Sequence, residues 1–435
     1  MPVDGNHGKK KIWDPLINKF RSKLAVWKAA SLSFGGRLTL LNSVLFALPI
    51  FYMSLFLIPN SVLVKLISIQ RTFLWGGFES QKKISWVKWD DVCCSKVKGG
   101  LGVANLRRKN WAMLGKWWYR FGDGGESLWK RIVTEKYYGG KWEEVDITTI
   151  GNWRTSKIWR DIISIGGRSM RLRNMLVEGF RWDVGEGNRV GFWNERWVGN
   201  KNLREECPRL YELATNKESK ISDMGTWEGD KWCWKIEWRR GRLGREKDEE
   251  EVLEELLDSF QLKKGMEDCW RWIHDLDGRY ETKKAYKFLA PTEQILEEQW
   301  SKLIWNRLVP SKVTFFGWRL CLDKLPTKWN IKKRGIPLQE EQLICVLCKD
   351  TVEEADHLFC MCKKAWIFWV EVLQWWGMET VIPNNVLGVA NIFVHDLGRI
   401  IGKEMGPMSS LWLLGTFGIG EMIWCLTMET TLRED

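Results

Sequence analysis

CVLCKDTVEEADHLFCMC, residues 345–362, is the stretch that decides how the C-terminal part of this chain folds. Two cysteines separated by two residues can grip one Zn²⁺ from a tight turn, and a histidine and a further cysteine about one helical turn apart can complete a tetrahedron. Thiolate and imidazole suit Zn²⁺ better than Mg²⁺ or Ca²⁺. The sequence therefore predicts one structural zinc ion, with no coordination position left for water, held by Cys345, Cys348, His357 and Cys362.

The fourth ligand has a competitor, because Cys360 lies between the last two ligands and could replace Cys362. The alternative to a metal site is a group of small buried residues in a reduced core, which is what scattered thiols such as Cys93 and Cys269 are expected to be. That alternative is weaker here, since the chain has only four histidines and one of them lies inside the cysteine cluster. The apolar residues expected to bracket the metal are Leu343, Leu347, Leu358, Phe359 and Trp366.

Positive charge is concentrated in the first third of the chain. Of 435 residues, 67 are Lys or Arg and 55 are Asp or Glu, and residues 1–140 alone hold 23 basic and 8 acidic residues. Lys and Arg gain affinity for phosphates by displacing condensed counterions, so this region is expected to face RNA or DNA. A solvated basic surface without a partner is the alternative. The candidate nucleic-acid-binding residues are Lys9, Lys10, Lys11, Lys19, Arg21, Lys23, Lys28 and Arg37.

Hydrophobic periodicity predicts a mainly α fold with small β-hairpins. Helices are expected over 9–30, 61–75, 110–121, 248–260, 282–289, 300–308, 313–320 and 329–334, and hairpins over 180–198 and 270–280. Most of the 31 tryptophans are expected to fill cores. We expect four regions: a basic helical unit (1–76), a Trp-rich α+β connector (77–290), a zinc-binding domain (291–380) and an atypical tail (381–435) that could be poorly ordered.

The stretch Leu38–Ile58 carries no charge and is long enough to span a membrane. Pro49 in its middle and the polar residues Asn42, Ser43 and Ser54 favour two buried helices broken at Leu48–Pro49 instead. A membrane is therefore not expected as a partner. The odd count of 11 cysteines and the lack of a signal-peptide pattern predict reduced thiols inside a cell, in nucleus or cytoplasm.

No catalytic residue is predicted. The pair Asp90–Asp91 invites comparison with polymerase aspartates, but Lys88 and Cys93–Cys94 supply neither a third carboxylate nor an apolar strand, so a solvated turn is expected. The glycines in KGGLG (98–102) lack the Lys-Ser/Thr that a phosphate-binding loop requires.

Several ordered blocks together resemble the C-terminal half of the polyprotein of plant LINE-type (non-LTR) retrotransposons. They include WDPLINKF at 13–20, WVKWDDVCCSKVKGGLGVANLR at 86–107 and VGEGNRVGFWNERWVG at 184–199, and the CVLC…HLFCMC cluster resembles the reverse-transcriptase zinc-binding domain of that family. The resemblance implies a thumb-like N-terminal unit and favours Cys362 over Cys360 as the fourth ligand.

The same resemblance implies parents that are RNA-directed DNA polymerases. Their aromatic-x-Asp-Asp motif would lie upstream of the block that begins here, so the polymerase palm is expected to be missing, and residues 381–435 are too short for the family's ribonuclease H domain. We therefore expect a zinc protein that binds RNA or DNA and has no polymerase centre of its own. A polymerase supplied by another chain, in trans, is a candidate partner. The alternative is a catalytically inert structural or protein-interaction remnant whose zinc only stabilises the fold, and the oligomeric state stays open.

Overall fold

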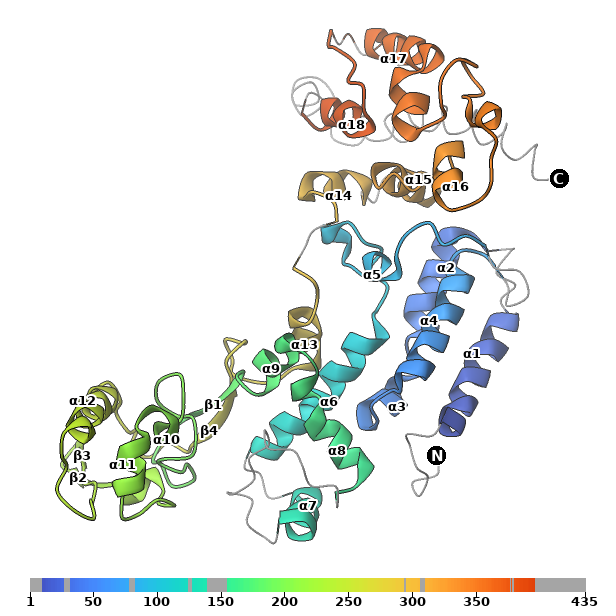
Figure 1. The fold of residues 1–435 in the computed structure, drawn as a ribbon. Helices are drawn as coiled ribbons and strands as arrows, with labels where there is room; N and C mark the ends of the chain where they lie inside the picture. The colour runs from blue at the N-terminus through green and yellow to red at the C-terminus, as the bar shows by residue number, and fades with distance from the viewer. Residues whose placement is uncertain are drawn as a thin grey trace. The chain divides into compact units, whose positions relative to one another are not determined.

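The computed structural model describes residues 10–26, 32–77, 83–123, 127–138, 155–292, 295–305, 310–375, 377 and 379–395 (Figure 1). Over these residues the chain is mainly helical, with two small antiparallel two-stranded sheets, as predicted. It divides into two compact units, and each is discontinuous in sequence. Unit 1 comprises Met1–Ile12, Ile50–Pro59 and Arg107–Ala290; unit 2 comprises Trp13–Pro49, Asn60–Leu106 and Pro291–Asp435.

The N-terminal part of unit 2 is built on two amphipathic helices, α1 (Asp14–Val26) and α4 (Asn60–Leu74). Helix α1 packs against α4 and buries Leu16, Ile17 and Phe20, while its other face is exposed. Burying one apolar stripe is how a helix of this pattern gains most of its stability. The predicted helices at 9–30 and 61–75 are thus confirmed over these ranges, and Trp27 lies outside the described residues.

Pro49 interrupts the uncharged stretch as predicted. The chain forms α2 (Phe34–Leu40), a π-helical turn (Leu41–Leu45) and then α3 (Ile50–Leu55), which begins directly after the proline. Proline lacks the N–H that a continuing helix would need, so the helix cannot run through it. Within the described ranges, no helix is both long and apolar enough to cross a membrane.

Five helices of unit 1 surround a core rich in aromatic residues: α6 (Leu106–Gly122), α7 (Leu128–Tyr138), α8 (Lys157–Ser164), α9 (Met170–Leu176) and α13 (Thr282–Phe288). Trp118 donates its indole N–H to the carbonyl of Ile162 at 2.6 Å, and Trp272 donates to the carbonyl of Met175 at 3.0 Å. Buried Asn110 of α6 donates to the carbonyls of Met53 and Phe56, both at 2.8 Å. These bonds satisfy buried polar groups and join segments distant in sequence.

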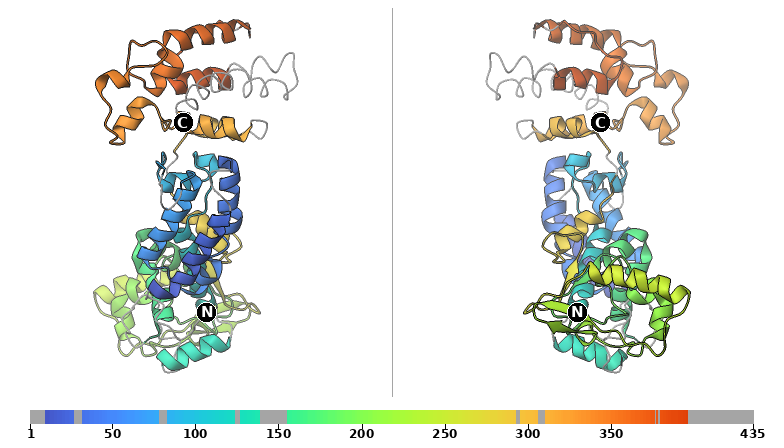
Figure 2. Two further views of the ribbon diagram at one scale, coloured as in Figure 1. Left: turned by 90° about the vertical axis from the view of Figure 1, so that its right-hand side faces the viewer. Right: turned by 90° about the vertical axis from the view of Figure 1, so that its left-hand side faces the viewer.

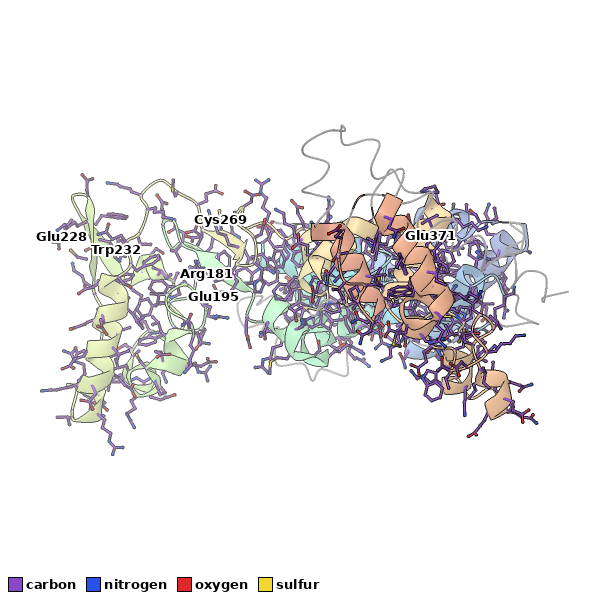
Figure 3. All side chains as sticks on the ribbon, turned by 90° about the horizontal axis from the view of Figure 1, so that it is seen from above. Arg181, Glu195, Glu228, Trp232, Cys269 and Glu371 are labelled. Atoms are coloured by element: carbon purple, nitrogen blue, oxygen red, sulfur yellow. The ribbon has the colours of Figure 1, made fainter. Side chains whose placement is uncertain are left out.

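The two expected hairpins are wrong in their pairing. Strand β1 (Phe180–Asp183) pairs antiparallel with β4 (Cys269–Trp272), so the two segments pair with each other instead of folding back locally (Figure 1). In the register, Phe180 lies opposite Trp272 and Asp183 opposite Cys269. A local hairpin does occur between β2 (Gly225–Glu228) and β3 (Lys231–Trp234), where none was predicted. Figure 3 labels Arg181 on β1, Cys269 on β4, and Glu228 and Trp232 of the second sheet.

A buried carboxylate explains why residues 184–189 do not return as a strand. Asp268, 3% exposed, accepts hydrogen bonds from the backbone N–H groups of Gly185 at 2.7 Å, Gly187 at 2.9 Å and Arg189 at 2.8 Å. Those donors would otherwise need strand partners, because buried backbone N–H groups are almost always bonded. The glycine turn is therefore held by one side chain that lies beside β4.

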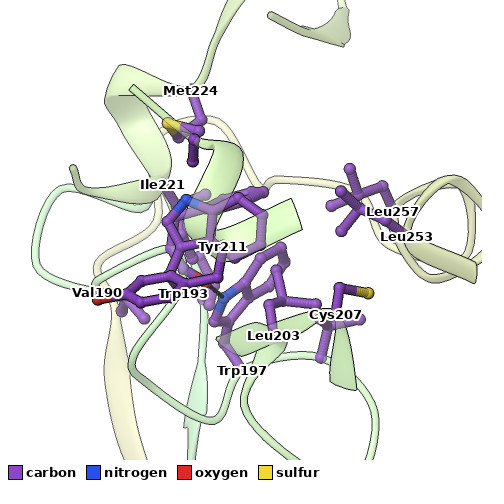
Figure 4. Packing of buried hydrophobic residues seen from close by; sticks show 14 of the residues in the cluster. Val190, Trp193, Trp197, Leu203, Cys207, Tyr211, Ile221, Met224, Leu253 and Leu257 are labelled. Carbon is purple, nitrogen blue, oxygen red and sulfur yellow. Dashed lines mark hydrogen bonds between the residues drawn. The ribbon is translucent and has the colours of Figure 1, made fainter. Parts of the chain in front are cut away.

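Between β1 and β4 the chain builds a separate tryptophan-rich core around α10 (Leu203–Glu206), α11 (Pro208–Leu213) and α12 (Arg245–Asp258). Figure 4 shows Trp193, Trp197 and Tyr211 together, with Leu253 and Leu257 approaching from α12. The rings of Phe192 and Trp193 meet edge to face, with centroids 5.1 Å apart. Val252 of the predicted apolar face of α12 is 40% exposed, so that face is narrower than expected.

Unit 2 further contains the short helix α5 (Trp89–Val92). The described residues of its C-terminal part form α14 (Glu298–Ile304), α15 (Ser311–Cys321), α16 (Lys328–Lys333), α17 (Lys363–Trp375) and α18 (Val386–His395). The helices predicted around 300–308, 313–320 and 329–334 are present as α14, α15 and α16. Figure 2 shows them in two further views, in the gold to orange colours of this part of the chain. Helix α18 lies in the expected tail and packs Val386 and Val389 into the core around Phe359. Residues 396–435 lie outside the described ranges.

Replacing Asp268 with Asn should destabilise unit 1 by about 3 kcal/mol. The carboxylate of Asp268 accepts the three N–H groups on its two oxygens, whereas an amide has one accepting oxygen and an NH2 group that would face an N–H donor. Urea unfolding followed by circular dichroism measures the loss. The matched control is Asp277→Asn, whose side chain is 77% exposed and should change stability by less than about 0.5 kcal/mol. An unchanged free energy of unfolding for Asp268→Asn would contradict the role assigned to this carboxylate.

Candidate metal centre

The first two cysteines lie on a tight turn between two bridged residues. Ile344 and Val352 form an antiparallel bridge, Cys345 donates its N–H to the carbonyl of Thr351 at 2.7 Å, and the N–H of Lys349 returns to the carbonyl of Cys345 at 2.9 Å. Lys349 has φ 56°, in the left-handed region that non-glycine residues seldom adopt. The backbone turn thereby directs the side chains of Cys345 and Cys348 towards one point.

A π-helical turn sets the spacing of the other two groups. It spans His357–Met361, and the N–H of Cys362 bonds to the carbonyl of His357 at 2.7 Å. In an α-helix a five-residue step rotates a side chain by roughly 140°, which would separate the two groups. The wider π turn brings His357 and Cys362 back to the same side, and α17 begins immediately afterwards.

The four ligand atoms converge. The thiols of Cys345, Cys348 and Cys362 and a ring nitrogen of His357 all lie within 4.8 Å of one another. The Sγ of Cys348 is 3.3 Å from Nε2 of His357. A Zn–S distance of about 2.3 Å gives a tetrahedron with edges of about 3.8 Å, so the donor set fits one zinc ion. Among the described residues, no other group of three or more His, Cys, Asp or Glu side chains converges in this way.

Burial and hydrogen bonding separate the pKa values of the two turn cysteines. Burial raises the pKa of Cys345, which is fully buried, to about 11. Burial also acts to raise the pKa of Cys348, but the backbone N–H groups of Thr351 and Asp350, the Thr351 hydroxyl and His357 lower it to about 6. Zinc binds the thiolate, so the fold itself favours the metal-binding form of Cys348.

Thr351 supports the site from outside the four ligand groups. Its Oγ1 lies 3.0 Å from both Nδ1 and Nε2 of His357 and 3.8 Å from the Sγ of Cys348. Hydrogen-bond partners behind a metal-binding histidine fix the orientation of its ring. The sequence analysis missed Thr351, although its position three residues after Cys348 places it in the same turn.

Cys360 faces a different part of the fold. It is 3% exposed and packs with Leu325, Phe359 and Trp369, and burial raises the pKa of its thiol to about 12. The converging group of ligand atoms contains Cys362 and not Cys360. The geometry therefore favours Cys362 as the fourth metal-binding group, as the family resemblance implied.

The apolar bracket differs from the expectation at one residue. Trp366 is 53% exposed, whereas Trp369, one helical turn later, is buried and donates its indole N–H to the carbonyl of Phe359 at 2.7 Å. Residue 366 follows directly on the first turn of α17 and points to solvent, so position 369 fills the space. Leu343 is buried, and Leu347 and Leu358 pack against Cys345 and Cys362, as expected.

The metal loop is connected to the helices beside it. Lys328, the first residue of α16, donates to the carbonyl of Ile344 at 2.6 Å and forms an ion pair of 3.5 Å with Glu353. The carboxylate of Asp356 accepts the N–H of Val386 at 2.9 Å and so caps the start of α18. Ordering the loop around a metal thus also orders α16 and α18.

The glycine-rich segment contacts the same module instead of a phosphate. The carbonyl of Gly99 accepts the indole N–H of Trp318 at 2.7 Å, and a Cβ at Gly99 would lie 2.8 Å from Leu296. Arg334 donates to the carbonyl of Ser85 at 2.9 Å and to that of Trp86. The role of these glycines is therefore close packing.

Asp90 and Asp91 lie inside the short helix α5, which begins at Trp89, so the expected solvated turn is wrong. Asp90 is exposed, and Asp91 is half-buried with its pKa raised by burial. Neither belongs to a converging carboxylate group within the described ranges.

The predicted basic residues fall into three sets. Lys19, Arg21 and Lys23 lie on the exposed face of α1. Arg37 is half-buried with its guanidinium 5.8 Å from the Phe34 ring, and burial lowers its pKa, so it does not belong to that face. Lys10 and Lys11 lie in a short 3₁₀ turn, Lys10–Trp13, whose first two side chains are not described, and Lys9 and Lys28 lie outside the described residues.

Similarity to known proteins supports the assignment of this metal centre. Residues 280–369 match the family model described as zinc-binding in reverse transcriptase, a range that contains all four converging groups. A protein of Arabidopsis thaliana named as a ribonuclease H protein is 30% identical over 419 residues, 95% of this chain, and the chain spans 63% of that protein's length. An uncharacterised mitochondrial protein of Arabidopsis thaliana is 33% identical over 154 residues, 35% of this chain and 93% of that protein.

The helical fold, the zinc-fitting cluster and the family match together define a zinc-binding domain of the reverse-transcriptase type. The chain belongs to the reverse-transcriptase-related proteins of plant retrotransposons.

Replacing Cys345 with Ser should reduce bound zinc from near stoichiometric to near zero, because one tetrahedral thiolate is lost. Elemental analysis of the purified protein after gel filtration measures zinc per chain. Cys360→Ser is the matched control: it removes a neighbouring buried thiol and should cost stability while retaining zinc. Loss of zinc in the Cys360 variant with retention in the Cys345 variant would overturn the geometry described here.

Proposed function

We propose that Cys345, Cys348, His357 and Cys362 coordinate one zinc ion, and that the module so held binds RNA or DNA. The observation that carries the proposal is the charge of residues 311–335, which cover α15, α16 and the turn between them. This segment has seven Lys or Arg residues and one Asp. A concentration of one charge sign on a small folded module attracts polyanions, since bound phosphates release counterions.

Much of this charge is exposed. Lys312, Lys332, Lys333 and Arg334 are exposed on α15, α16 and the residue that follows. No carboxylate of the described residues forms an ion pair with Lys312 or Lys332, and the only one near Lys333 is Asp323 at 4.0 Å. Cations that lack nearby carboxylates keep their full attraction for phosphates. The exposed cations of this segment can therefore contact the phosphates of a nucleic-acid backbone.

Zinc binding and this basic segment are coupled through α16. Lys328 bonds to the carbonyl of Ile344, and the N–H of Trp329 reaches the carbonyl of Glu353 at 3.3 Å. Ile344 and Glu353 lie on the two sides of the metal loop. A folded loop thus fixes the position of α16, so removal of the metal should weaken nucleic-acid binding as well as stability.

The exposed face of α1 offers a second basic surface in unit 2, formed by Lys19, Arg21 and Lys23. The buried apolar face of α1 anchors the helix, so these three side chains extend from a fixed backbone. We assign them a supporting role in binding.

The relatives agree with a nucleic-acid partner, since one of them bears the name of a ribonuclease H protein. We further propose that the residues present here bind nucleic acid without polymerising it, and act beside a polymerase supplied in trans. Two-metal phosphoryl transfer needs carboxylates that share metal ions, and Asp90 and Asp91 are not joined by a third such group in the described structure. The competing function is an inert scaffold in which zinc serves only stability.

The purified zinc-loaded protein should bind single-stranded RNA with an affinity that falls linearly, on logarithmic axes, as salt rises. Replacing Lys312, Lys332 and Lys333 with Gln should reduce the slope by about 2, at about 0.7 per lost phosphate contact. Fluorescence anisotropy of a labelled oligonucleotide measures both. The control replaces three exposed lysines of unit 1, Lys231, Lys235 and Lys247, and should leave the slope unchanged. Absence of binding at low salt would favour the inert scaffold.

Primer extension by this chain alone, with an RNA template, deoxynucleotides and Mg²⁺, should give no product. The reason is that Asp90 and Asp91 cannot hold two metal ions without a further carboxylate. Gel electrophoresis of the primer detects extension. Any product that disappears on Asp91→Asn would show a polymerase centre in this chain and refute this part of the proposal.

A further inference from the structure

The basic segment carries one aromatic side chain that lies at the surface beside lysines of its own helix. Trp329, the second residue of α16, is half-buried at the surface, and two lysines of the same helix lie over its ring. The Nζ of Lys332 is 5.9 Å and that of Lys333 is 5.4 Å from the ring centroid. Residues three and four positions apart share a helix face, so the three side chains form one surface. We refer to Trp329, Lys332 and Lys333 as the stacking surface.

The backbone beneath the stacking surface is firmly held. Thr327 caps α16 by accepting the N–H of Asn330 at 3.3 Å. The buried amide of Asn330 donates to the carbonyl of Leu325 at 3.1 Å and to the carboxylate of Asp323 at 2.9 Å. A ring on such a support loses little conformational freedom when a ligand binds, which favours affinity.

The lysines of the stacking surface are less engaged with carboxylates than the cations that lie over Tyr211 and Trp238. Lys217 lies over the Tyr211 ring but pairs with Glu212 at 2.5 Å, and Arg242 lies over Trp238 but pairs with Glu250 at 2.8 Å. In the described structure Lys332 has no ion pair. Lys333 only approaches Asp323 at 4.0 Å, and the side chains of Lys333 and Asp323 are each more than half exposed. At Tyr211 and Trp238 the cation completes the fold, whereas here two cations are available to a ligand.

An indole ring beside two exposed ammonium groups matches a ligand that has a flat π-face flanked by negative charge. An unpaired nucleobase in a single strand presents this combination, whereas a duplex hides its base faces and presents only phosphates. We propose that the stacking surface binds an unpaired base of single-stranded nucleic acid, with the two lysines on the adjacent phosphates. This inference rests on the proposed nucleic-acid binding and adds to it a site and a preference for single strands.

The test compares Trp329→Ala with the parent protein on a short single-stranded oligonucleotide and on a blunt duplex of the same sequence. Affinity for the single strand should fall about 5- to 150-fold, the range for loss of one stacked base, with an unchanged salt slope. Affinity for the duplex should change less than about twofold, since no base face is available there. Trp329→Phe should retain most of the binding because it keeps an aromatic face.

The lysines are tested separately from the ring. Lys332→Gln with Lys333→Gln should reduce the salt slope for the single strand by about 1.4, at about 0.7 per phosphate. A free mononucleotide, which carries the same base and phosphate groups as the strand, is added as a competitor. If it displaces the labelled strand at concentrations similar to those of unlabelled strand, the surface is a mononucleotide site and the proposal is wrong. Zinc content of each variant confirms that the module is folded.

Trp366→Ala is the matched control, because Trp366 is an exposed tryptophan of the same module and no described lysine or arginine lies over its ring. It should bind the single strand like the parent. Equal losses in the Trp366 and Trp329 variants, or no loss in the Trp329 variant while the parent binds, would overturn the stacking site and leave the proposed function standing. Failure of the parent to bind either nucleic acid would overturn both.

Discussion

Closure of the chain around one metal between Cys345 and Cys362 is the constraint on which the C-terminal module depends. The helices of this module are short, and its two apolar clusters are small. Small cores of this kind gain stability from a metal that joins distant residues. Helix α16 is bonded to one side of the loop through Lys328, and α18 begins at the carboxylate of Asp356. The position of the basic segment therefore follows from the coordination chemistry.

Tryptophan connects many of the other elements. Several indole N–H groups donate to backbone carbonyls of other segments, as in Trp118 to Ile162, Trp272 to Met175 and Trp318 to Gly99. Each such side chain buries a large apolar area and also satisfies a carbonyl that irregular backbone would leave unpaired. This dual use accounts for a high tryptophan content in a fold of short helices and small sheets.

Local patterns in the sequence were sufficient for the helices, for the break at Pro49 and for the converging cysteines and histidine, because periodicity, proline chemistry and ligand spacing act over a few residues. The pairing of β1 with β4 was beyond such patterns, since strand partners far apart leave no local trace. The same holds for Asp268, whose three donors lie far upstream, and for Trp369, which replaces Trp366 in the core because the orientation of α17 is set by the π turn before it.

The pairing of β1 with β4 brings the two ends of the excursion from Val184 to Asp268 side by side. The excursion has its own tryptophan-rich core and its own hairpin, and Asp268 ties its last residues to its first. In topological terms this segment is an insertion whose first and last residues lie next to each other. Such a segment can lengthen, shorten or be exchanged during evolution without a change in the path of the chain through the surrounding helices, as long as the two short strands still pair.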